Sequence, residues 1–236
     1  KIDIEAPQES ILVADFNEWV KTYTGPKFNF IHCDFPYGIG ADRRKQGGSV
    51  ELHGSYDDDE DTFWRLTATL IEHLDVLATE SCHFMFWFSM HYYQRIIDLF
   101  ESSSDIRFDH FPLIWLKSDN IGLLPDPERG PRRIYETCLF GSRGDRKIVS
   151  AVSNAYSAST DRRYHMSVKP QPVLQHFFKM LVDSNSLVLD PTCGSGSSLR
   201  AAEALGARYV LGLERNEEFA EIANQELNKQ RRQKNA

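Results

Sequence analysis

Short apolar runs alternate with amphipathic segments along this chain of 236 residues. The short runs, bounded by polar or glycine-containing segments, predict β-strands at residues 11–13, 28–33, 82–88, 111–116, 134–140, 186–189 and 208–213. Helical spacing of apolar residues predicts helices at residues 63–77, 92–100, 171–182, 198–205 and 216–229. Strands that alternate with helices favour an α/β domain with a largely parallel sheet.

Two polar segments interrupt this pattern. Residues 38–61 are rich in charge and contain several glycines, which predicts a mobile loop, and the acidic run Asp57–Asp59 suits the start of the following helix. Ser142–Tyr164 has no clear periodicity and predicts an extended loop. Because the chain has neither an internal repeat nor a linker, we expect a single domain over residues 1–236.

The composition limits the class of protein. The chain is 41% hydrophobic, enough for a sizeable core. It has no apolar run of the roughly 20 residues that span a bilayer, and no secretory signal pattern at its start. The four cysteines Cys33, Cys82, Cys138 and Cys193 lie far apart without a C-x-x-C motif, so we expect free thiols in a reducing cytoplasm and no metal site.

Charge is distributed unevenly. The formal net charge of −7 argues weakly against a general nucleic-acid coat. Between Lys117 and Lys169, however, ten Lys and Arg residues stand against six Asp and Glu, and Arg43, Arg44 and Lys45 form a second basic cluster. These clusters predict phosphate binding, with an ordinary solvated surface as the alternative.

The segment Asp34–Tyr37 follows the predicted strand at 28–33 and combines a carboxylate with an aromatic ring. The exocyclic amine of a base is a poor nucleophile because its lone pair is delocalised into the ring. A charge-assisted hydrogen bond from the amine to Asp34 would localise that lone pair. Tyr37 would stack on the base, a contact worth about 1–3 kcal/mol. Taken alone, the segment is also compatible with a turn that simply ends a strand.

The segment Asp190–Gly196 follows a predicted strand and precedes a predicted helix. Its glycines permit positive φ and allow the backbone to approach a ligand closely. Glu214 ends the next predicted strand, where an acid accepts hydrogen bonds from ribose hydroxyls. An ordinary turn is again the alternative, but the strand, helix and acid together favour a nucleoside site.

In this order, the two motifs resemble the β (permuted) class of S-adenosylmethionine-dependent DNA amino-methyltransferases, the DNA N4/N6-methyltransferase family, from about Ile11 to Leu227. The resemblance implies a Rossmann-like methyltransferase fold with permuted motif order. Its sheet would be mostly parallel with an antiparallel edge strand, and helices would cover both faces. The resemblance also implies S-adenosylmethionine as cofactor and DNA as substrate, with a target base flipped out of the duplex.

The resemblance assigns roles to single residues. The catalytic motif matches at Asp34, Phe35, Pro36 and Tyr37, with Phe35 in place of the usual proline. The cofactor-binding elements match at Asp15, Phe16, His165, Lys169, Pro170, Asp190, Thr192, Cys193, Gly194, Ser195, Gly196, Glu214 and Arg215. An aspartate at the first catalytic position favours adenine N6 over cytosine N4.

The element from His165 to Pro170 departs from the family pattern H-P-x-Q-K-P at Met166 and Val168, which leaves its contacts with the methionine part of the cofactor open.

The sequence reveals no separate segment for recognition of a target sequence. Residues 38–61 and 116–164 are the candidate DNA-facing segments. Their basic side chains would hold phosphates or read guanine: Arg43, Arg44, Lys45, Arg129, Arg132, Arg133, Arg143 and Arg146. The small size predicts a short or relaxed recognition sequence, unless recognition lies in a segment outside this chain.

Several alternatives stay open at this stage. The chemistry could be directed at cytosine N4 or at adenine in RNA, or the chain could be an inactive cofactor-binding regulator that binds DNA. We expect a cytoplasmic protein of a bacterial or phage-infected cell without a membrane partner, and a homodimer is one possible assembly. The role in restriction, cell regulation or phage self-protection is open.

Overall fold

The computed structural model describes residues 10–36, 60–122, 125, 128, 130–161 and 168–234. Several predicted features lie outside these ranges: the loop at 38–59 with the helix start at Asp57–Asp59, and the residues Tyr37, Arg43, Arg44, Lys45, Arg129 and His165.

The described strands form one nine-stranded sheet in the order β1-β9-β8-β2-β3-β6-β5-β7, with β4 paired to β6. Their bounds are β1 (Ile11–Val13), β2 (Phe28–Cys33), β3 (Ala78–Phe88), β4 (Arg107–Phe108), β5 (Leu113–Lys117), β6 (Tyr135–Arg143), β7 (Ala155–Ala158), β8 (Leu187–Asp190) and β9 (Tyr209–Glu214). The pairs β1–β9, β9–β8, β8–β2 and β2–β3 are parallel, as is β5–β7. β6 runs antiparallel to β3, β4 and β5.

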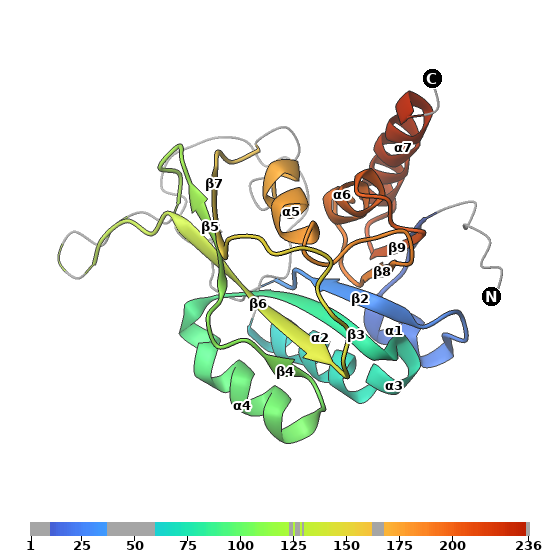
Figure 1. The fold of residues 1–236 in the computed structure, drawn as a ribbon, viewed down its shortest axis with the longest axis horizontal. Coiled ribbons are helices and arrows are strands. Elements are labelled where there is room, and N and C mark those ends of the chain that lie inside the picture. Colours follow the sequence, from blue (N-terminus) through green and yellow to red (C-terminus); the bar gives the residue numbers. More distant parts are fainter. Residues whose placement is uncertain are drawn as a thin grey trace.

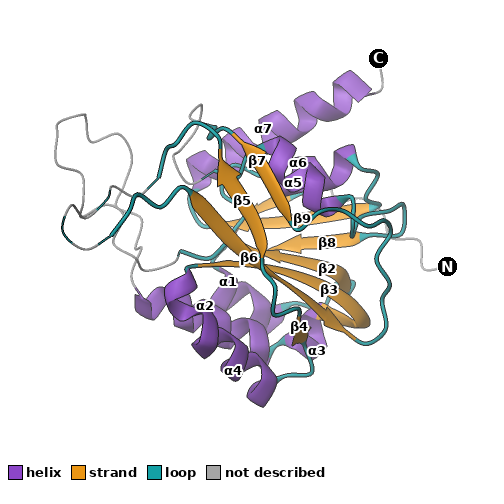
Figure 2. Ribbon diagram, turned by 60° about the vertical axis from the view of Figure 1, so that its left-hand side comes forward, coloured by secondary structure: helices purple, strands orange, loops and turns teal. Residues whose placement is uncertain are grey.

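Helices cover both faces of the sheet (Figure 1). One face carries α1 (Phe16–Trp19), α2 (Glu60–Glu72), α3 (Leu74–Leu77) and α4 (Tyr93–Ser103). The other face carries α5 (Gln171–Phe178), α6 (Ser197–Ala204) and α7 (Glu217–Lys234). Short 3₁₀ helices occupy Val20–Thr22 and Met90–Tyr92. The turned view in Figure 2 shows the twisted sheet between these two helical layers.

The central strands are apolar throughout because both of their faces are buried. In β3, Phe84, Phe86 and Phe88 belong to the core beneath α2 and α4, whereas Met85 and Trp87 belong to the core beneath α5 and α6. Successive side chains of a strand point to opposite faces, so a single strand supplies both cores. This alternation fixes the register of β3 between β2 and β6, since a slip of one residue would exchange the two sets.

The predicted fold class is confirmed: the sheet is mixed and mostly parallel, with helices on both faces. The antiparallel strand β6 lies inside the sheet, between β3 and β5, rather than at its edge. The predicted strands and helices are present with boundaries shifted by a few residues, except that the single helix predicted at 63–77 is divided into α2 and α3. Phe111 precedes β5 with 77% of its surface exposed. A single domain over the whole chain stays a prediction.

One prediction is corrected by β7, which lies within the segment expected to be an extended loop. The segment Ser142–Tyr164 also includes the last residues of β6. β7 pairs only with β5 among the described strands, and its residues alternate between exposed and half-buried positions. Such a short edge strand lacks the apolar run by which buried strands are recognised. The two-residue strand β4 escaped prediction for the same reason.

A chain of buried polar side chains crosses the middle of the sheet. Trp87 Nε1 donates to His32 Nε2 at 2.9 Å, and His32 Nδ1 lies 2.8 Å from Asp190 Oδ2. Because an indole N–H can only donate, Nε2 accepts and Nδ1 carries the hydrogen that His32 gives to Asp190. Ser198 donates to the same oxygen of Asp190. The chain therefore ties together β3, β2, β8 and α6.

We predict that Trp87→Phe lowers the free energy of unfolding by about 1–3 kcal/mol, because it takes the donor away from a buried acceptor on His32. Denaturant unfolding measures the loss.

Trp64→Phe is the matched control for that variant. Trp64 is half-buried and donates its Nε1 to the exposed Glu60 at 3.0 Å. Because water can replace this bond, the control should cost no more than about 0.5 kcal/mol. Equal losses in the two variants would contradict the structural role of the Trp87–His32 bond.

Candidate active site

The carboxyl ends of neighbouring parallel strands bring three acidic residues to one edge of the sheet. Asp34 directly follows β2, Asp190 ends β8 and Glu214 ends β9. β8 lies between β2 and β9, in parallel register with both. The chain leaving β2 reaches α2 on one face, whereas the chain leaving β8 reaches α6 on the other. Such a reversal of crossover direction opens a crevice at the carboxyl ends of the two strands, where open α/β sheets bind ligands.

The turn after β8 is shaped by backbone conformations that favour glycine. Gly194 and Gly196 have φ values of 50° and 69°. At Gly196, a Cβ atom would also lie 2.8 Å from Ile11 Cδ1, so the Ile11 side chain would have to shift to admit one. Asp190 Oδ1 accepts from the backbone N–H of Thr192 at 3.0 Å and holds the start of the turn. The predicted glycine loop is thus built from the residues that the sequence singled out.

Glu214 is buried beside this turn, with 3% of its surface exposed. Its carboxylate accepts from the backbone N–H of Asn216 at 2.8 Å and from the backbone of Gly194. Burial raises the pKa of Glu214, against the opposing effect of these hydrogen bonds and of Arg215. The carboxylate retains acceptor capacity for hydroxyl groups of a ligand in the crevice.

A crevice open to solvent lies between these elements. Its walls combine apolar and polar side chains, contributed by Ala14, Asp15, Phe16, Asn17, Pro36, Thr62, Arg65, Leu66, Pro191, Thr192, Leu213, Glu214 and Arg215. Apolar walls with a buried acceptor at one end suit a nucleoside, in which a flat base adjoins a ribose.

Sequence reasoning missed the contribution of α2 to this crevice. Thr62, Arg65 and Leu66 line it, although the apolar residues of the helix have the spacing of a helix that packs against the core. The spacing of Thr62 and Leu66 places them on one face of the helix, but only the fold shows that this face meets the strand ends. Asp15, at the N-cap of α1, was predicted and lines the crevice while it accepts from Asn17 N at 2.8 Å.

Asp34 lies beside the cofactor turn. The hydroxyl of Thr192 donates to the backbone carbonyl of Asp34 at 3.3 Å, which links the two motifs directly. Pro36 lines the crevice, and Tyr37 lies outside the described residues. The side chain of Phe35 is only 1% exposed, so its ring serves the core and does not face a ligand.

The ring of Phe35 also packs α1 against the sheet. Its ring stacks on Phe16 with ring centroids 6.3 Å apart, and it meets Phe86 edge-on at 5.6 Å. Phe16 is itself 2% exposed while it contributes to the crevice wall. The departure from proline at Phe35 therefore provides a packing contact between α1, β2 and β3.

Lys169 was expected beside the cofactor, but the structure places it on Asp34. Its ammonium lies 2.8 Å from both carboxylate oxygens of Asp34 and 3.1 Å from Glu136 Oε2. Burial by itself would lower the pKa of Lys169, but the charges of Asp34 and Glu136 outweigh burial and raise it. Lys169 is therefore held as a cation, and Asp34 has a fixed positive partner.

The other residues predicted to bind the cofactor lie in different places. Ser195 lies in the turn, where its carbonyl accepts from Arg200 at 2.8 Å, and Arg215 lines the crevice. Cys193 instead directs its thiol into the core against Gly212, and burial raises the pKa of that thiol well above its usual range. Pro170 is the N-cap residue of α5. His165 lies outside the described residues.

The predicted DNA-binding arginines lie at opposite ends of β6. Arg132 and Arg133 precede the strand and are exposed at the same edge as Asp34. Arg143 is the last residue of the strand and lies at the opposite edge of the sheet, where it pairs with Cys82 of β3. Arg129 lies outside the described residues.

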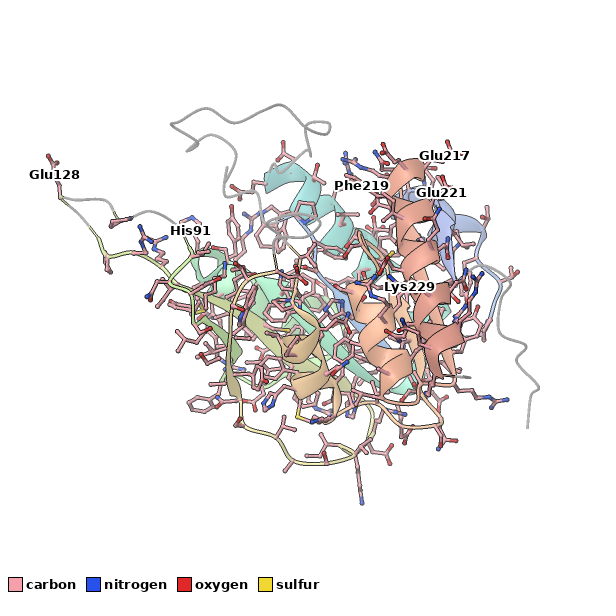
Figure 3. All side chains as sticks on the ribbon, turned by 90° about the horizontal axis from the view of Figure 1, so that it is seen from above. His91, Glu128, Glu217, Phe219, Glu221 and Lys229 are labelled. Carbon is pink, nitrogen blue, oxygen red and sulfur yellow. The ribbon has the colours of Figure 1, made fainter. Side chains whose placement is uncertain are left out.

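The two arginines at the far edge have structural partners. Arg143 binds Asp105 at 2.8 Å and Asp75 at 2.5 Å. Arg146 donates to the carbonyl of Leu181 at 3.3 Å. A DNA-facing role for the segment 116–164 stays a prediction, and Arg132 and Arg133 lie in its connection between β5 and β6. Figure 3 shows this connection reaching beyond the body as far as Glu128, on the side away from Glu217 and Lys229 of α7.

Two further features bear on the class of site. No helix in the described part of the chain combines the length and apolar character needed to cross a membrane. Residues 10–36, 60–122, 130–161 and 168–234 contain no cluster of three His, Cys, Asp or Glu side chains arranged to hold a metal ion.

A sequence model of the DNA methylase family N6_N4_Mtase matches residues 28–225, which include both motifs and Glu214. The chain belongs to this DNA methylase family. Two known relatives match over 65 residues each. They are the type II methyltransferase M.HindIII of Haemophilus influenzae, at 35% identity over 28% of this chain and 21% of that protein, and the putative methylase YubD of Escherichia coli, at 38% identity over 28% of each. The chain thus matches only about a quarter of the length of these relatives.

Solved structures of DNA methylases share the fold. The complex of M1.HpyAVI with S-adenosylmethionine matches with a TM-score of 0.70 at 18% identity, over 94% of this chain and 100% of that one. The putative DNA modification methylase TTHA0409 of Thermus thermophilus gives 0.62 at 14%, over 94% of both chains. The cytosine-N4-specific PvuII DNA methyltransferase gives 0.60 at 13%, over 97% and 93%. At these identities the likeness concerns the fold of the methylase family.

Proposed function

We propose that this protein transfers a methyl group from S-adenosylmethionine to the exocyclic amine of a DNA base, with adenine N6 as the target. The observation that carries the proposal is the hydrogen bond between Thr192 and the carbonyl of Asp34. It joins the turn suited to a nucleoside to the carboxylate suited to an amine, so that the two reactants would meet at one strand edge. Membership of the DNA methylase family supports the same chemistry.

The crevice supplies what the nucleoside half of S-adenosylmethionine requires. Glu214 would accept from the two ribose hydroxyls, and Phe16, Pro191 and Leu213, which line the crevice, would form apolar walls around the adenine. A protonated Glu214 would lose acceptors, so the raised pKa of this residue makes cofactor binding weaken as the pH falls toward that value. S-adenosylmethionine supplies an electrophilic methyl group bonded to a sulfonium sulfur.

Asp34 would act on the amine. An N–H group of the base donates to its carboxylate, which draws the nitrogen lone pair out of the ring and toward the methyl group. The N–C bond forms as the S–C bond breaks, and the sulfur retains the electron pair of the broken bond. The nitrogen then loses a proton, through Asp34 or to water, which leaves a neutral methylamino group. Apart from this contact, the protein contributes mainly alignment of the two reactants.

The carboxylate of Asp34 follows β2 and is only 23% exposed. A base that is paired and stacked in a duplex could not reach it, so the base would have to leave the duplex. Adenine is favoured over cytosine by the aspartate at position 34, as the family resemblance implies. Cytosine N4 is the second candidate, since a structural relative is cytosine-N4-specific.

We predict that the protein, incubated with S-adenosylmethionine and DNA, produces N6-methyladenine when the DNA is digested to nucleosides and analysed by mass spectrometry. Asp34→Asn should abolish the product while calorimetric titration still detects cofactor binding. Glu214→Gln should instead weaken cofactor binding by about 1.5–3 kcal/mol, the range for hydrogen bonds to charged groups.

The outcomes separate the alternatives. N4-methylcytosine would transfer the proposal to cytosine, and methylation of RNA alone would exclude DNA as substrate. If the protein binds the cofactor but methylates neither DNA nor RNA, the result would favour an inactive cofactor-binding regulator. Loss of cofactor binding in a folded Asp34→Asn variant would contradict the division of roles between Asp34 and Glu214.

The positions of the arginines generate a second prediction. Replacing Arg132 and Arg133 together by Gln should weaken DNA binding and reduce the slope of log affinity against log salt by up to about 2, near one unit for each lost phosphate contact. Fluorescence anisotropy over a salt series measures the slope.

Arg143→Gln is the control for this experiment. Its guanidinium is engaged by Asp75 and Asp105 at the far edge, so the variant should lose stability and keep the salt slope of the wild type. A reduced slope for Arg143→Gln, or an unchanged slope for the double variant, would place the DNA on a different face.

A further inference from the structure

Three charged side chains from distant parts of the sequence form a row with the carboxylate of Asp34. Lys169 Nζ lies 2.8 Å from both oxygens of Asp34 and 3.1 Å from Glu136 Oε2. The second oxygen of Glu136 lies 2.7 Å from Lys117 Nζ. The charges alternate in sign along this row, from Asp34 to Lys169, Glu136 and Lys117, and they sum to zero.

The cluster is assembled by the sheet. Asp34 follows β2, Lys117 ends β5 and Glu136 lies at the start of β6, while Lys169 approaches from the segment before α5. Side-chain exposures are 4% for Lys169, 12% for Lys117, 19% for Glu136 and 23% for Asp34. Asp34 is therefore the most exposed member of the row, and Lys169 lies between it and Glu136.

We propose that Glu136 is a positioning residue for methyl transfer: through Lys169 it fixes the orientation in which Asp34 receives the target amine. The inference rests on the proposed function and adds to it a residue that does not touch the reactants.

The number of hydrogen-bond donors on an ammonium group supports this role. Lys169 has three N–H donors, and three carboxylate oxygens lie within 3.1 Å of its nitrogen, two on Asp34 and one on Glu136. A lysine side chain is long and flexible, so an ammonium bound only to Asp34 would be free to pivot about that contact. The third contact fixes the ammonium from behind, and with it the plane of the Asp34 carboxylate.

This arrangement leaves Asp34 able to act. Each carboxylate oxygen has more than one acceptor site, so each can bind Lys169 and still accept from another donor. The amine of a base would then meet a carboxylate whose direction is already set, which is the alignment that an in-line transfer requires.

The charges of these residues also keep Lys169 protonated. The groups that face Lys169 are Asp34 from β2, Glu136 and the Cys138 thiol from β6, Lys117 through Glu136, and the ring of Trp87 at 4.9 Å. Burial opposes ionisation of Glu136, but Lys169 and Lys117 outweigh it and lower the pKa of Glu136. Asp34 and Glu136 together keep Lys169 charged, so the loss of either carboxylate lowers the pKa of Lys169.

The competing interpretation is an ion-pair cluster that only stabilises the fold. The two interpretations differ in what Glu136→Gln does. A structural pair affects stability alone, whereas a positioning residue affects the rate of the chemical step and its dependence on pH.

The test is the single-turnover rate of methyl transfer by Glu136→Gln, measured with DNA and S-adenosylmethionine across the alkaline pH range. We expect the rate to fall by about tenfold or more, as for a misplaced reacting group, while both substrates bind with unchanged affinity. The rate of Glu136→Gln should also begin to decline, on the alkaline limb of its pH profile, at a lower pH than that of the wild type, since Lys169 has lost one of two nearby negative charges.

Glu203→Gln is the matched control. Glu203 has the same side-chain exposure of 19%, and it forms an ion pair with Arg231 on the far side of α6. This control should lose stability without a change in the rate of transfer or in its pH profile. If Glu136→Gln does not fold, Glu136→Asp provides the test, because it keeps the charge but withdraws the oxygen from Lys169. The rate should then fall while the alkaline limb stays in place.

The inference is overturned if Glu136→Gln transfers methyl groups at the wild-type rate with an unmoved alkaline limb, or if Glu203→Gln changes both in the same way. A folded Glu136→Asp variant with an unchanged rate overturns it as well. A wild-type protein that methylates no DNA overturns the proposed function and the inference together, whereas an active wild type with an unaffected Glu136→Gln overturns the inference alone.

Discussion

The parallel pairing of β2 with β8 is the constraint on which the site depends. It brings together Asp34 and Thr192, which are 158 residues apart in the chain, and it does so where the crossover helices leave toward opposite faces. Neither motif forms a site alone: the turn after β8 offers a place for a nucleoside, and the end of β2 offers a carboxylate. The register of the pair decides that the two lie side by side. The buried contact between His32 and Asp190 maintains that register from within the core.

Buried charge is concentrated around this same strand pair, which has an energetic cost that the structure offsets locally. Asp190 is hydrogen-bonded by His32, Ser198 and the backbone of Thr192. Lys169 has two carboxylates around it, and Glu136 has two lysines. Removing one partner from such a set leaves an uncompensated buried group, which is more damaging than removing the whole set. The polar groups that serve the chemistry are therefore also the ones to which the folded state is most sensitive.

The sequence predicted the parts of the site that depend on local structure. Asp34 follows a strand, and Asp190 and Glu214 each end one, whose apolar runs are plain in the sequence. The residue type of Gly194 and Gly196 permits the positive φ that both adopt. The layered fold followed from the alternation of strands and helices. The interior position of β6 did not, since strand order is set by contacts between segments far apart in the chain.

The same limit explains why the sequence did not predict two features of the side-chain arrangement. The pairing of Lys169 with Asp34 and Glu136 depends on where β6 lies in the sheet, and the separation of Arg132 from Arg143 depends on the direction in which β6 runs. The most direct test of the account is a crystal structure of the protein with S-adenosylhomocysteine. We expect the ribose hydroxyls within hydrogen-bond distance of Glu214 and the sulfur directed toward Asp34. A nucleoside bound elsewhere, or a sulfur directed away from Asp34, would contradict it.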